Sequence, residues 1–215
     1  MRILVPFEAT RPKTRLGPLL DAEERTAFAR AMLCDVLAAL LSAGHDPELV
    51  TTARISIPDD DRFAGEDIAG TVDDRSLSAA INDRLDAAVD TVAVVVADLA
   101  LVTPATVARL VAAGDDADIA IAPGRGGGTN ALVISQPDFR VDFHGVSYRD
   151  HRQAARAVDA EVSVVDSMRL STDVDEPADL VEVLLHGEGA AASWLRDAGV
   201  ELDTSGGRVG VRRTE

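Results

Sequence analysis

The chain has 215 residues, of which 47% are hydrophobic, and its formal net charge is -16. This size and composition suit one buried core, so we expect a single domain over residues 1–215. The negative charge repels polyanions at long range and argues against binding to nucleic acid or anionic lipid. No apolar run approaches the ~18 residues of a membrane span and no signal peptide is recognised, so a cytoplasmic protein is expected.

The basic residues are unusual. Of 21 basic residues only Lys13 is a lysine, so 20 are arginines. One interpretation is adaptation to high salt, with lysine lost from the whole surface. The remaining Lys13 would then have a task that the broad planar guanidinium of arginine cannot perform. High genomic GC content is the alternative, and it gives Lys13 no special role. The one cysteine, Cys34, excludes an internal disulfide and a cysteine metal cage. We interpret it as a core residue rather than a reactive thiol.

Strands and helices alternate in the first half of the chain. Residues 2–7 form an apolar strand, and a helix follows that begins at a capping box of Asp21 and Glu24 and ends before Gly44. A short strand at residues 48–52 and a helix at residues 77–89 come next. Residues 91–96 are apolar on both alternating faces, which is typical of a central strand covered by helices on each side.

The second half continues the alternation. Thr103 and Pro104 are typical of a helix start. The further predicted elements are strands at residues 118–122, 131–135 and 162–165, two helices after an acidic turn, and a hairpin at residues 200–202 and 208–211. This order predicts an α/β fold with a mostly parallel central sheet flanked by helices. Ligands of such sheets bind outside the carboxyl ends of the strands.

The loop after the first strand, residues 8–16, carries three cations in an acidic protein: Arg11, Lys13 and Arg15. It lacks the two glycines and the Lys-Ser/Thr pair of a P-loop, so a P-loop ATPase is not indicated. A basic loop is often only a solvated surface. Its position after the first strand favours contact with phosphates instead.

Carboxylates follow two other predicted strands. Asp98 comes directly after the central strand and should project from its end, because burial of an unpaired carboxylate is costly. Asp173 and Asp175 lie on one side of an extended segment, with Val174 directed into the protein. These side chains suit Mg²⁺, which prefers oxygen ligands. Helix capping is the alternative for Asp98, although Thr103 already caps the helix that follows, and for Asp175 or Glu176.

Two segments between these carboxylates contain small residues. In the glycine-rich loop, residues 123–130, Gly127 and Gly128 allow backbone amides to approach an anion closely, with Thr129 and Asn130 as neighbouring polar groups. A plain hairpin turn is the alternative. Residues 143–151 could bind an acid or its phosphate, whereas the isolated His144 and His151 are interpreted as structural. No Ser/His/Asp triad or histidine-rich zinc site is present.

Taken together, these motifs resemble the 2-phospho-L-lactate guanylyltransferase family, CofC, over nearly the whole chain. The resemblance is carried by Pro12-Lys13-Thr14-Arg15-Leu16, Ala97-Asp98-Leu99, the run from Pro123 to Leu132, Gly145-Val146-Ser147, and the run from Thr172 to Leu180. The first two motifs are shared with other nucleotidyltransferases, including those that load molybdopterin. The glycine run and the Asp-x-Asp-x-Pro turn are more specific to the family.

The resemblance implies a Rossmann-like nucleotide-diphospho-sugar transferase fold, a homodimer and a step in coenzyme F-420 biosynthesis. It implies that GMP from GTP is joined to 2-phospho-L-lactate, giving lactyl-2-diphospho-5'-guanosine and pyrophosphate. It assigns Mg²⁺ binding to Asp98, Asp173 and Asp175. It assigns acid-phosphate binding to Thr129, Gly145 and Ser147, and it directs Lys13 at the triphosphate.

We therefore expect transfer driven by alignment and charge neutralisation, with Lys13 and Arg15 stabilising the departing pyrophosphate. No general base is required, because the attacking phosphate oxygen is already ionised at neutral pH. Transfer to phosphoenolpyruvate, 3-phosphoglycerate or molybdopterin, and a nucleotide-binding module without catalysis, are the alternatives.

Overall fold

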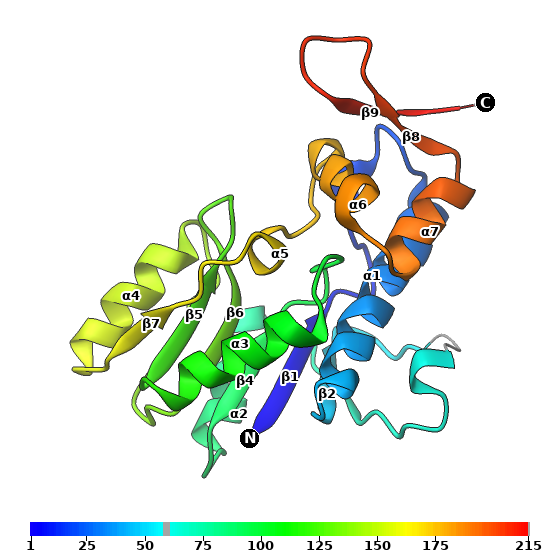
Figure 1. The fold of residues 1–215 in the computed structure, drawn as a ribbon. Helices are drawn as coiled ribbons and strands as arrows, with labels where there is room; N and C mark the ends of the chain where they lie inside the picture. The colour runs from blue at the N-terminus through cyan, green and yellow to red at the C-terminus, as the bar shows by residue number, and fades with distance from the viewer. Residues whose placement is uncertain (58–60, 215) are drawn as a thin grey trace.

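The computed structural model describes residues 1–57 and 61–214, and Figure 1 shows a sheet with helices on both faces. Seven strands form this sheet in the order β3-β2-β1-β4-β6-β5-β7. They are β1 (Arg2–Phe7), β2 (Pro47–Thr51), β3 (Gly70–Val72), β4 (Val92–Val95), β5 (Ile119–Pro123), β6 (Thr129–Ile134) and β7 (Val162–Val164). All pairings are parallel except those of β6 with β4 and β5. The predicted α/β fold with a mostly parallel sheet is confirmed.

The helices follow the predicted pattern with several additions. They are α1 (Ala22–Ser42), α2 (Leu77–Asp86), α3 (Pro104–Asp115), α4 (Ser147–Ala157), α5 (Met168–Ser171), α6 (Leu180–His186) and α7 (Ala190–Asp197), with 3-10 turns η1 (Thr14–Leu16), η2 (Asp61–Phe63) and η3 (Pro177–Asp179). Asp21 and Glu24 form the predicted capping box, and Thr103 caps α3. Sequence patterns did not predict β3, α4 or α5, because all three are short or weakly apolar.

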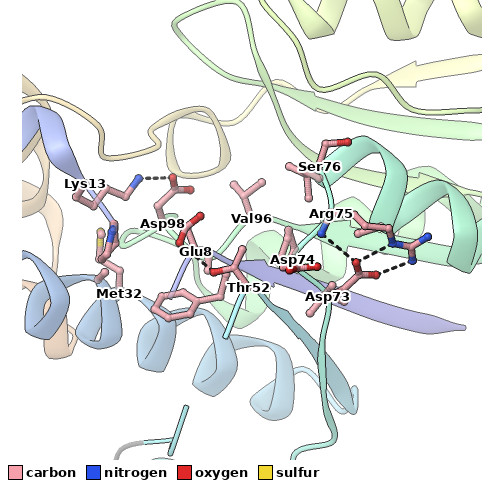
Figure 2. Close-up of a pocket in the computed structure, with 18 of the residues that line it drawn as sticks. Glu8, Lys13, Met32, Thr52, Asp73, Asp74, Arg75, Ser76, Val96 and Asp98 are labelled. Atoms are coloured by element: carbon pink, nitrogen blue, oxygen red, sulfur yellow. Dashed lines mark hydrogen bonds and ion pairs between the residues drawn. The ribbon is translucent and has the colours of Figure 1, made fainter. Parts of the chain in front are cut away.

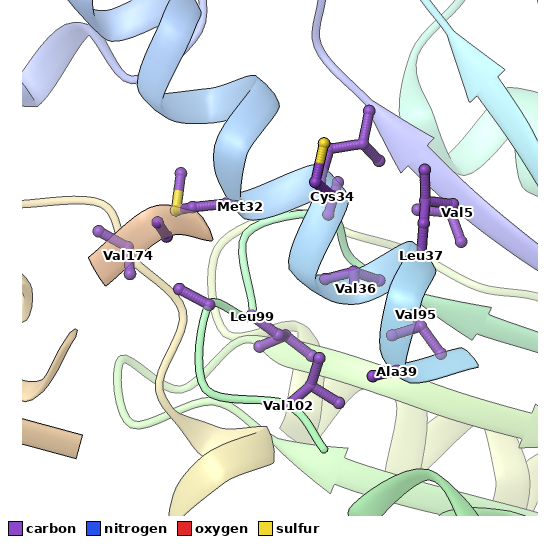
Figure 3. Close-up of a cluster of buried hydrophobic side chains, with 14 of the residues drawn as sticks. Val5, Met32, Cys34, Val36, Leu37, Ala39, Val95, Leu99, Val102 and Val174 are labelled. Atoms are coloured by element: carbon purple, nitrogen blue, oxygen red, sulfur yellow. The ribbon is translucent and has the colours of Figure 1, made fainter. Parts of the chain in front are cut away.

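The sheet separates two hydrophobic clusters. On one face Ile3 and Val5 of β1 pack with residues of α1, α3 and α7. On the other face Leu4 packs with residues of α2 and α4. Figure 3 shows part of the first cluster, in which Val5 and Val95 of the sheet approach α1, and which also includes Val174. Cys34 is buried in this cluster, as predicted for a core residue.

A buried carboxylate joins α1 to α7. The side chain of Asp35 accepts hydrogen bonds from the backbone nitrogens of Ala190 and Ala191 at 2.7 and 2.9 Å, and from Arg62 at 2.8 Å. These amides belong to the first turn of α7 and have no acceptor within the helix. The interaction fixes α7 against α1. Two other residues of α1, Ala29 and Met32, line the site described below.

The C-terminal strands β8 (Val200–Asp203) and β9 (Gly210–Arg213) pair as the predicted hairpin, the second strand starting two residues later than expected. The hairpin projects beyond α6 and α7 (Figure 1), and Arg213 anchors it by donating to Glu24 at 2.8 Å. Across the described residues, every helix is too short or too polar to cross a bilayer.

Candidate active site

A cavity of about 540 Å³ lies at the carboxyl ends of β1, β2 and β4. This is the edge of the sheet at which ligands of α/β proteins bind. Apolar walls come from the strand ends and from Ala29 and Met32 of α1. The polar residues of its lining are Glu8, Lys13, Thr52, Asp73, Asp74, Arg75, Ser76, Asp98 and Asp175. In Figure 2 Lys13 and Asp98 lie at one end of the cavity, whereas Asp73, Arg75 and Ser76 lie at the other.

Lys13 joins two carboxylates from distant parts of the chain. Its Nζ donates to Asp98 Oδ2 at 2.6 Å and to Asp175 Oδ1 at 2.8 Å. Burial acts to lower the pKa of Lys13, but the charges of the two carboxylates outweigh it and raise the pKa to about 12. The lysine is therefore charged at any physiological pH. Its backbone is left-handed, with a φ of 51°, which is uncommon for a residue with a side chain.

Asp173 lies beside this ion-paired cluster but has a different partner. Its Oδ1 accepts a hydrogen bond from Asn130 Nδ2 at 2.9 Å, and the same amide donates to the carbonyl of Leu170 at 3.0 Å. Burial raises the pKa of Asp173, and the charges of Asp98 and Asp175 raise it further against the effect of the Asn130 hydrogen bond. The three carboxylates are thus close enough to influence one another electrostatically.

These groups fit a divalent cation. In the described part of the chain, Asp98 Oδ1 is a buried oxygen without a hydrogen-bond partner. A carboxylate oxygen left in this way, next to two more carboxylates, matches the oxygen donors that Mg²⁺ prefers. No three His, Cys, Asp or Glu side chains among the described residues are already arranged as metal ligands. The reason is that the Lys13 ammonium lies between Asp98 and Asp175, while Asn130 holds Asp173.

Glu8 lines the cavity and holds the neighbouring backbone in place by hydrogen bonds. Its Oε1 accepts from the Thr10 amide at 2.7 Å and from the Thr52 hydroxyl at 2.9 Å. Partial burial acts to raise the pKa of Glu8, but the hydrogen bonds from Thr10, Thr52 and Arg11 bring it below its ordinary value. Glu8 is therefore a carboxylate whose bonds shape the loop and link the ends of β1 and β2.

At the far end of the cavity two adjacent aspartates differ in their surroundings. Asp73 accepts from Arg75 and Arg84, each at 2.8 Å, and these bonds hold the pKa of its carboxyl well below the usual range. Asp74 has no hydrogen bond to any residue that the structure describes, and it also lines the cavity. It is the carboxylate at this end that remains available to a ligand.

The glycine-rich loop is the turn that joins the antiparallel strands β5 and β6. This placement agrees with a plain hairpin turn and also with a turn that binds a ligand. Tyr148 N, in the first turn of α4, donates to the carbonyl of Gly127 at 3.2 Å, which holds the loop against α4. Ser147 opens α4 and is buried, whereas Gly145 is exposed with a φ of 54°. Thr129 is buried and bonded to His151 at 2.9 Å.

The structure brings Lys13, Asp98, Asp173 and Asp175 together, and it places Arg15 on the rim, exposed and 3.8 Å from Asp175. Val174 is fully buried between the two aspartates, as the extended pattern predicted. Asn130 holds Asp173, and its expected contact with substrate stays a prediction.

Sequence reasoning did not identify several residues of the cavity wall: Glu8, Thr52, Asp73 and Asp74. Position was an available signal for two of them, because Glu8 follows the strand predicted at residues 2–7 and Thr52 ends the strand predicted at residues 48–52. Asp73 and Asp74 follow β3, which sequence patterns did not predict, so no such signal marked them.

Solved structures share this architecture. A protein of Desulfovibrio desulfuricans described as a nucleotide-diphospho-sugar transferase superposes with a TM-score of 0.70 at 19% identity, over 92% of this chain and 95% of that one. The 2-C-methyl-D-erythritol 4-phosphate cytidylyltransferase of Thermus thermophilus gives a TM-score of 0.52 at 17% identity, over 91% and 98%. These likenesses show that the chain has the fold of the nucleotide-diphospho-sugar transferase class.

The sequence narrows this class. The chain belongs to the family of guanylyl transferase CofC-like proteins, whose model matches residues 1–214. It is 58% identical to the 2-phospho-L-lactate guanylyltransferase of Halomicrobium mukohataei over 99% of this chain and 100% of that one. It is 52% identical to the enzyme of the same name from Natrialba magadii over 99% of each chain.

The packing around Asn130 gives a first prediction. A Cβ added at Gly124 would lie 2.6 Å from Asn130 Oδ1, whereas one added at Gly126 would meet nothing within 4 Å. Gly124→Ala should therefore displace Asn130 from Asp173. If Asp173 binds the metal, kcat should fall by roughly 10- to 100-fold, as it does when a group that orients a metal ligand is lost. Gly126→Ala serves as the matched control and should stay close to the parent.

Pyrophosphate release at saturating GTP measures both variants, and circular dichroism checks that each is folded. Equal activity of the two glycine variants would show that Asn130 does not position Asp173.

Proposed function

We propose that this protein transfers GMP from GTP to 2-phospho-L-lactate, giving lactyl-2-diphospho-5'-guanosine and pyrophosphate for coenzyme F-420 biosynthesis. The observation that carries the proposal is the Lys13, Asp98 and Asp175 cluster at one end of a nucleotide-sized cavity. The names of the relatives identify 2-phospho-L-lactate as the acceptor, and the cavity is the proposed binding site for GTP. The triphosphate lies at the Lys13 end and the base lies at the Asp74 end.

In this reaction an ionised phosphate oxygen of the acid attacks the α-phosphorus of GTP. The new phosphorus–oxygen bond forms as the bond to the β-phosphate oxygen breaks, and that oxygen leaves with pyrophosphate. Protein groups need only align the two phosphates and neutralise their charge, so no proton has to be removed. Mg²⁺, held by Asp98, Asp173 and Asp175, would supply charge neutralisation at the phosphates.

Lys13 is suited to the leaving group. Its ammonium is charged and nearly buried, and its present partners are two carboxylates. When a triphosphate enters, Lys13 can exchange a carboxylate oxygen for a phosphate oxygen and remain paired, and the released carboxylate would then be free to hold Mg²⁺. Arg15 on the rim adds a second, solvated cation close to Asp175 and Glu176. Lys13 and Arg15 together stabilise pyrophosphate as it departs.

Incubation of the purified protein with GTP, Mg²⁺, high salt and a panel of phosphorylated three-carbon acids tests the proposed function. High salt is included because a surface this acidic repels itself when it is not screened. We expect one pyrophosphate per guanylylated 2-phospho-L-lactate, identified by mass spectrometry. Exclusive product from phosphoenolpyruvate or 3-phosphoglycerate would overturn the acceptor assignment, and absence of any product would favour a binding module.

Asp98 tests the proposed metal site. Asp98→Asn keeps the shape of the side chain but removes the charge that would bind a divalent cation. Turnover should fall by roughly 100- to 1000-fold or more, as expected when transition-state charge stabilisation is lost. Asp116→Asn makes the same change at an exposed position outside the cavity and should retain full activity.

Thermal unfolding midpoints of Asp98→Asn and Asp116→Asn should both remain close to the parent value. An active and folded Asp98→Asn enzyme would remove Asp98 from the chemistry.

Asp74 provides a test of base recognition. The Watson–Crick edge of guanine offers two donors, N1–H and the N2 amino group, and a carboxylate accepts from both. Asp74→Asn should lower kcat/KM for GTP by roughly 100-fold, because a site built to pair polar groups rejects a partner that leaves them unpaired. Xanthosine triphosphate carries an oxygen at position 2, so its use should increase in this variant.

Asp74→Ala is the matched control, since it should lose GTP use without gaining use of the xanthosine nucleotide. Unchanged GTP kinetics in both variants would place guanine recognition elsewhere.

A further inference from the structure

His151 is a fully buried histidine of α4 that the proposed reaction does not use. Both of its ring nitrogens have partners. The backbone nitrogen of Asp142 donates to Nε2 at 2.9 Å, and Nδ1 lies 2.9 Å from Thr129 Oγ1. The rings of Phe139 and Phe143 pack beside it, with centroids at 6.0 and 5.1 Å.

These contacts determine where the ring carries its proton. A backbone N–H can only donate, so Nε2 must be the unprotonated acceptor. Burial lowers the pKa of His151 to about 4 despite the opposing charges of Asp142 and Asp150, so the ring is neutral near pH 7. A neutral imidazole with a bare Nε2 carries its hydrogen on Nδ1. Nδ1–H therefore donates to the hydroxyl oxygen of Thr129.

This bond determines what the Thr129 hydroxyl can do. Its oxygen accepts from His151, so its own hydrogen is free to point at another acceptor. Within the described residues the hydroxyl has no second hydrogen bond. Thr129 follows the glycine-rich loop, which the Tyr148 amide holds against the first turn of α4, and it precedes Asn130, which holds Asp173. In the chain, Thr129 thus lies between the glycine-rich loop and the residue that holds Asp173, and its hydroxyl keeps one hydrogen for a further acceptor.

We propose that His151 is a positioning residue that makes the Thr129 hydroxyl a hydrogen-bond donor to the phosphate of the acceptor acid. This role rests on the proposed function and on the acid-phosphate contact that the family resemblance implies for Thr129. His151 itself does not touch the substrate. It fixes the rotation of one hydroxyl group, so that the group presents a proton rather than a lone pair to a polyanion.

Two substitutions at His151 separate the two bonds of the ring. The amide nitrogen of asparagine occupies nearly the position of Nδ1, so His151→Asn can still donate to Thr129. The amide oxygen of glutamine reaches nearly the position of Nε2, so His151→Gln can accept from Asp142 but does not donate to Thr129. We expect His151→Gln to raise KM for the acceptor acid by roughly tenfold with KM for GTP unchanged, and His151→Asn to remain within about threefold of the parent.

Thr129→Val provides a double-mutant cycle, because it removes the hydroxyl but keeps the branched shape. If His151 acts through this hydroxyl, adding His151→Gln to Thr129→Val should raise KM for the acid no further. If the increases in KM from the two substitutions multiply in the double mutant, His151 only supports the fold. The same conclusion holds if the KM changes of His151→Asn and His151→Gln simply follow their unfolding midpoints.

A spectroscopic measurement on the parent protein avoids any folding defect of the variants. Nitrogen-15 chemical shifts of the histidine rings should show His151, one of four histidines, protonated at Nδ1 and bare at Nε2. A ring protonated at Nε2 would overturn the proposal. Guanylyl transfer by the parent is measured first, so that failure of the proposed function is distinguished from failure of the role of His151.

Discussion

The pairing of one buried ammonium with two carboxylates is the interaction on which the site depends. Lys13 lies 85 residues before Asp98 and 162 residues before Asp175 in the chain. Loss of both carboxylates would leave the Lys13 ammonium as an uncompensated buried charge, which is strongly destabilising, whereas either carboxylate alone still pairs with it. The three segments that carry these residues are therefore held together at the sheet edge. The left-handed backbone of Lys13 is consistent with a loop held by its ion pairs.

Much of this arrangement could be predicted from the sequence because strand ends are easy to recognise. The apolar run before Asp98 predicts a central strand, and a carboxylate directly after such a strand has to leave the core. Alternation in an extended segment likewise placed Val174 inside and the flanking aspartates outside. In each case one local rule determined which side of the chain faces the core.

The rest could not be predicted because it depends on which segments meet in space. Asn130 has the same sequence neighbours whether it binds substrate or Asp173, and only the fold brings residues 130 and 173 together. The lone His151 looked structural because its partners, Thr129 and Asp142, are set by how α4 packs on the sheet. The polar composition of α4 also hid the helix, because only Ser147, His151 and Ala155 of its 11 residues are buried.

The start of β6 is where the two halves of the site are connected. The β5–β6 pairing shifts register there: Ala122 pairs with Ala131 but Pro123 pairs with Thr129, so Asn130 has no partner on β5. Such a bulge changes the direction in which side chains point. Thr129 bonds to His151 on α4, whereas its neighbour Asn130 bonds to Asp173 in the carboxylate cluster. Because these residues are adjacent, the conformation of one bulge sets the spacing between the side proposed to bind the acid and the side proposed to bind the metal.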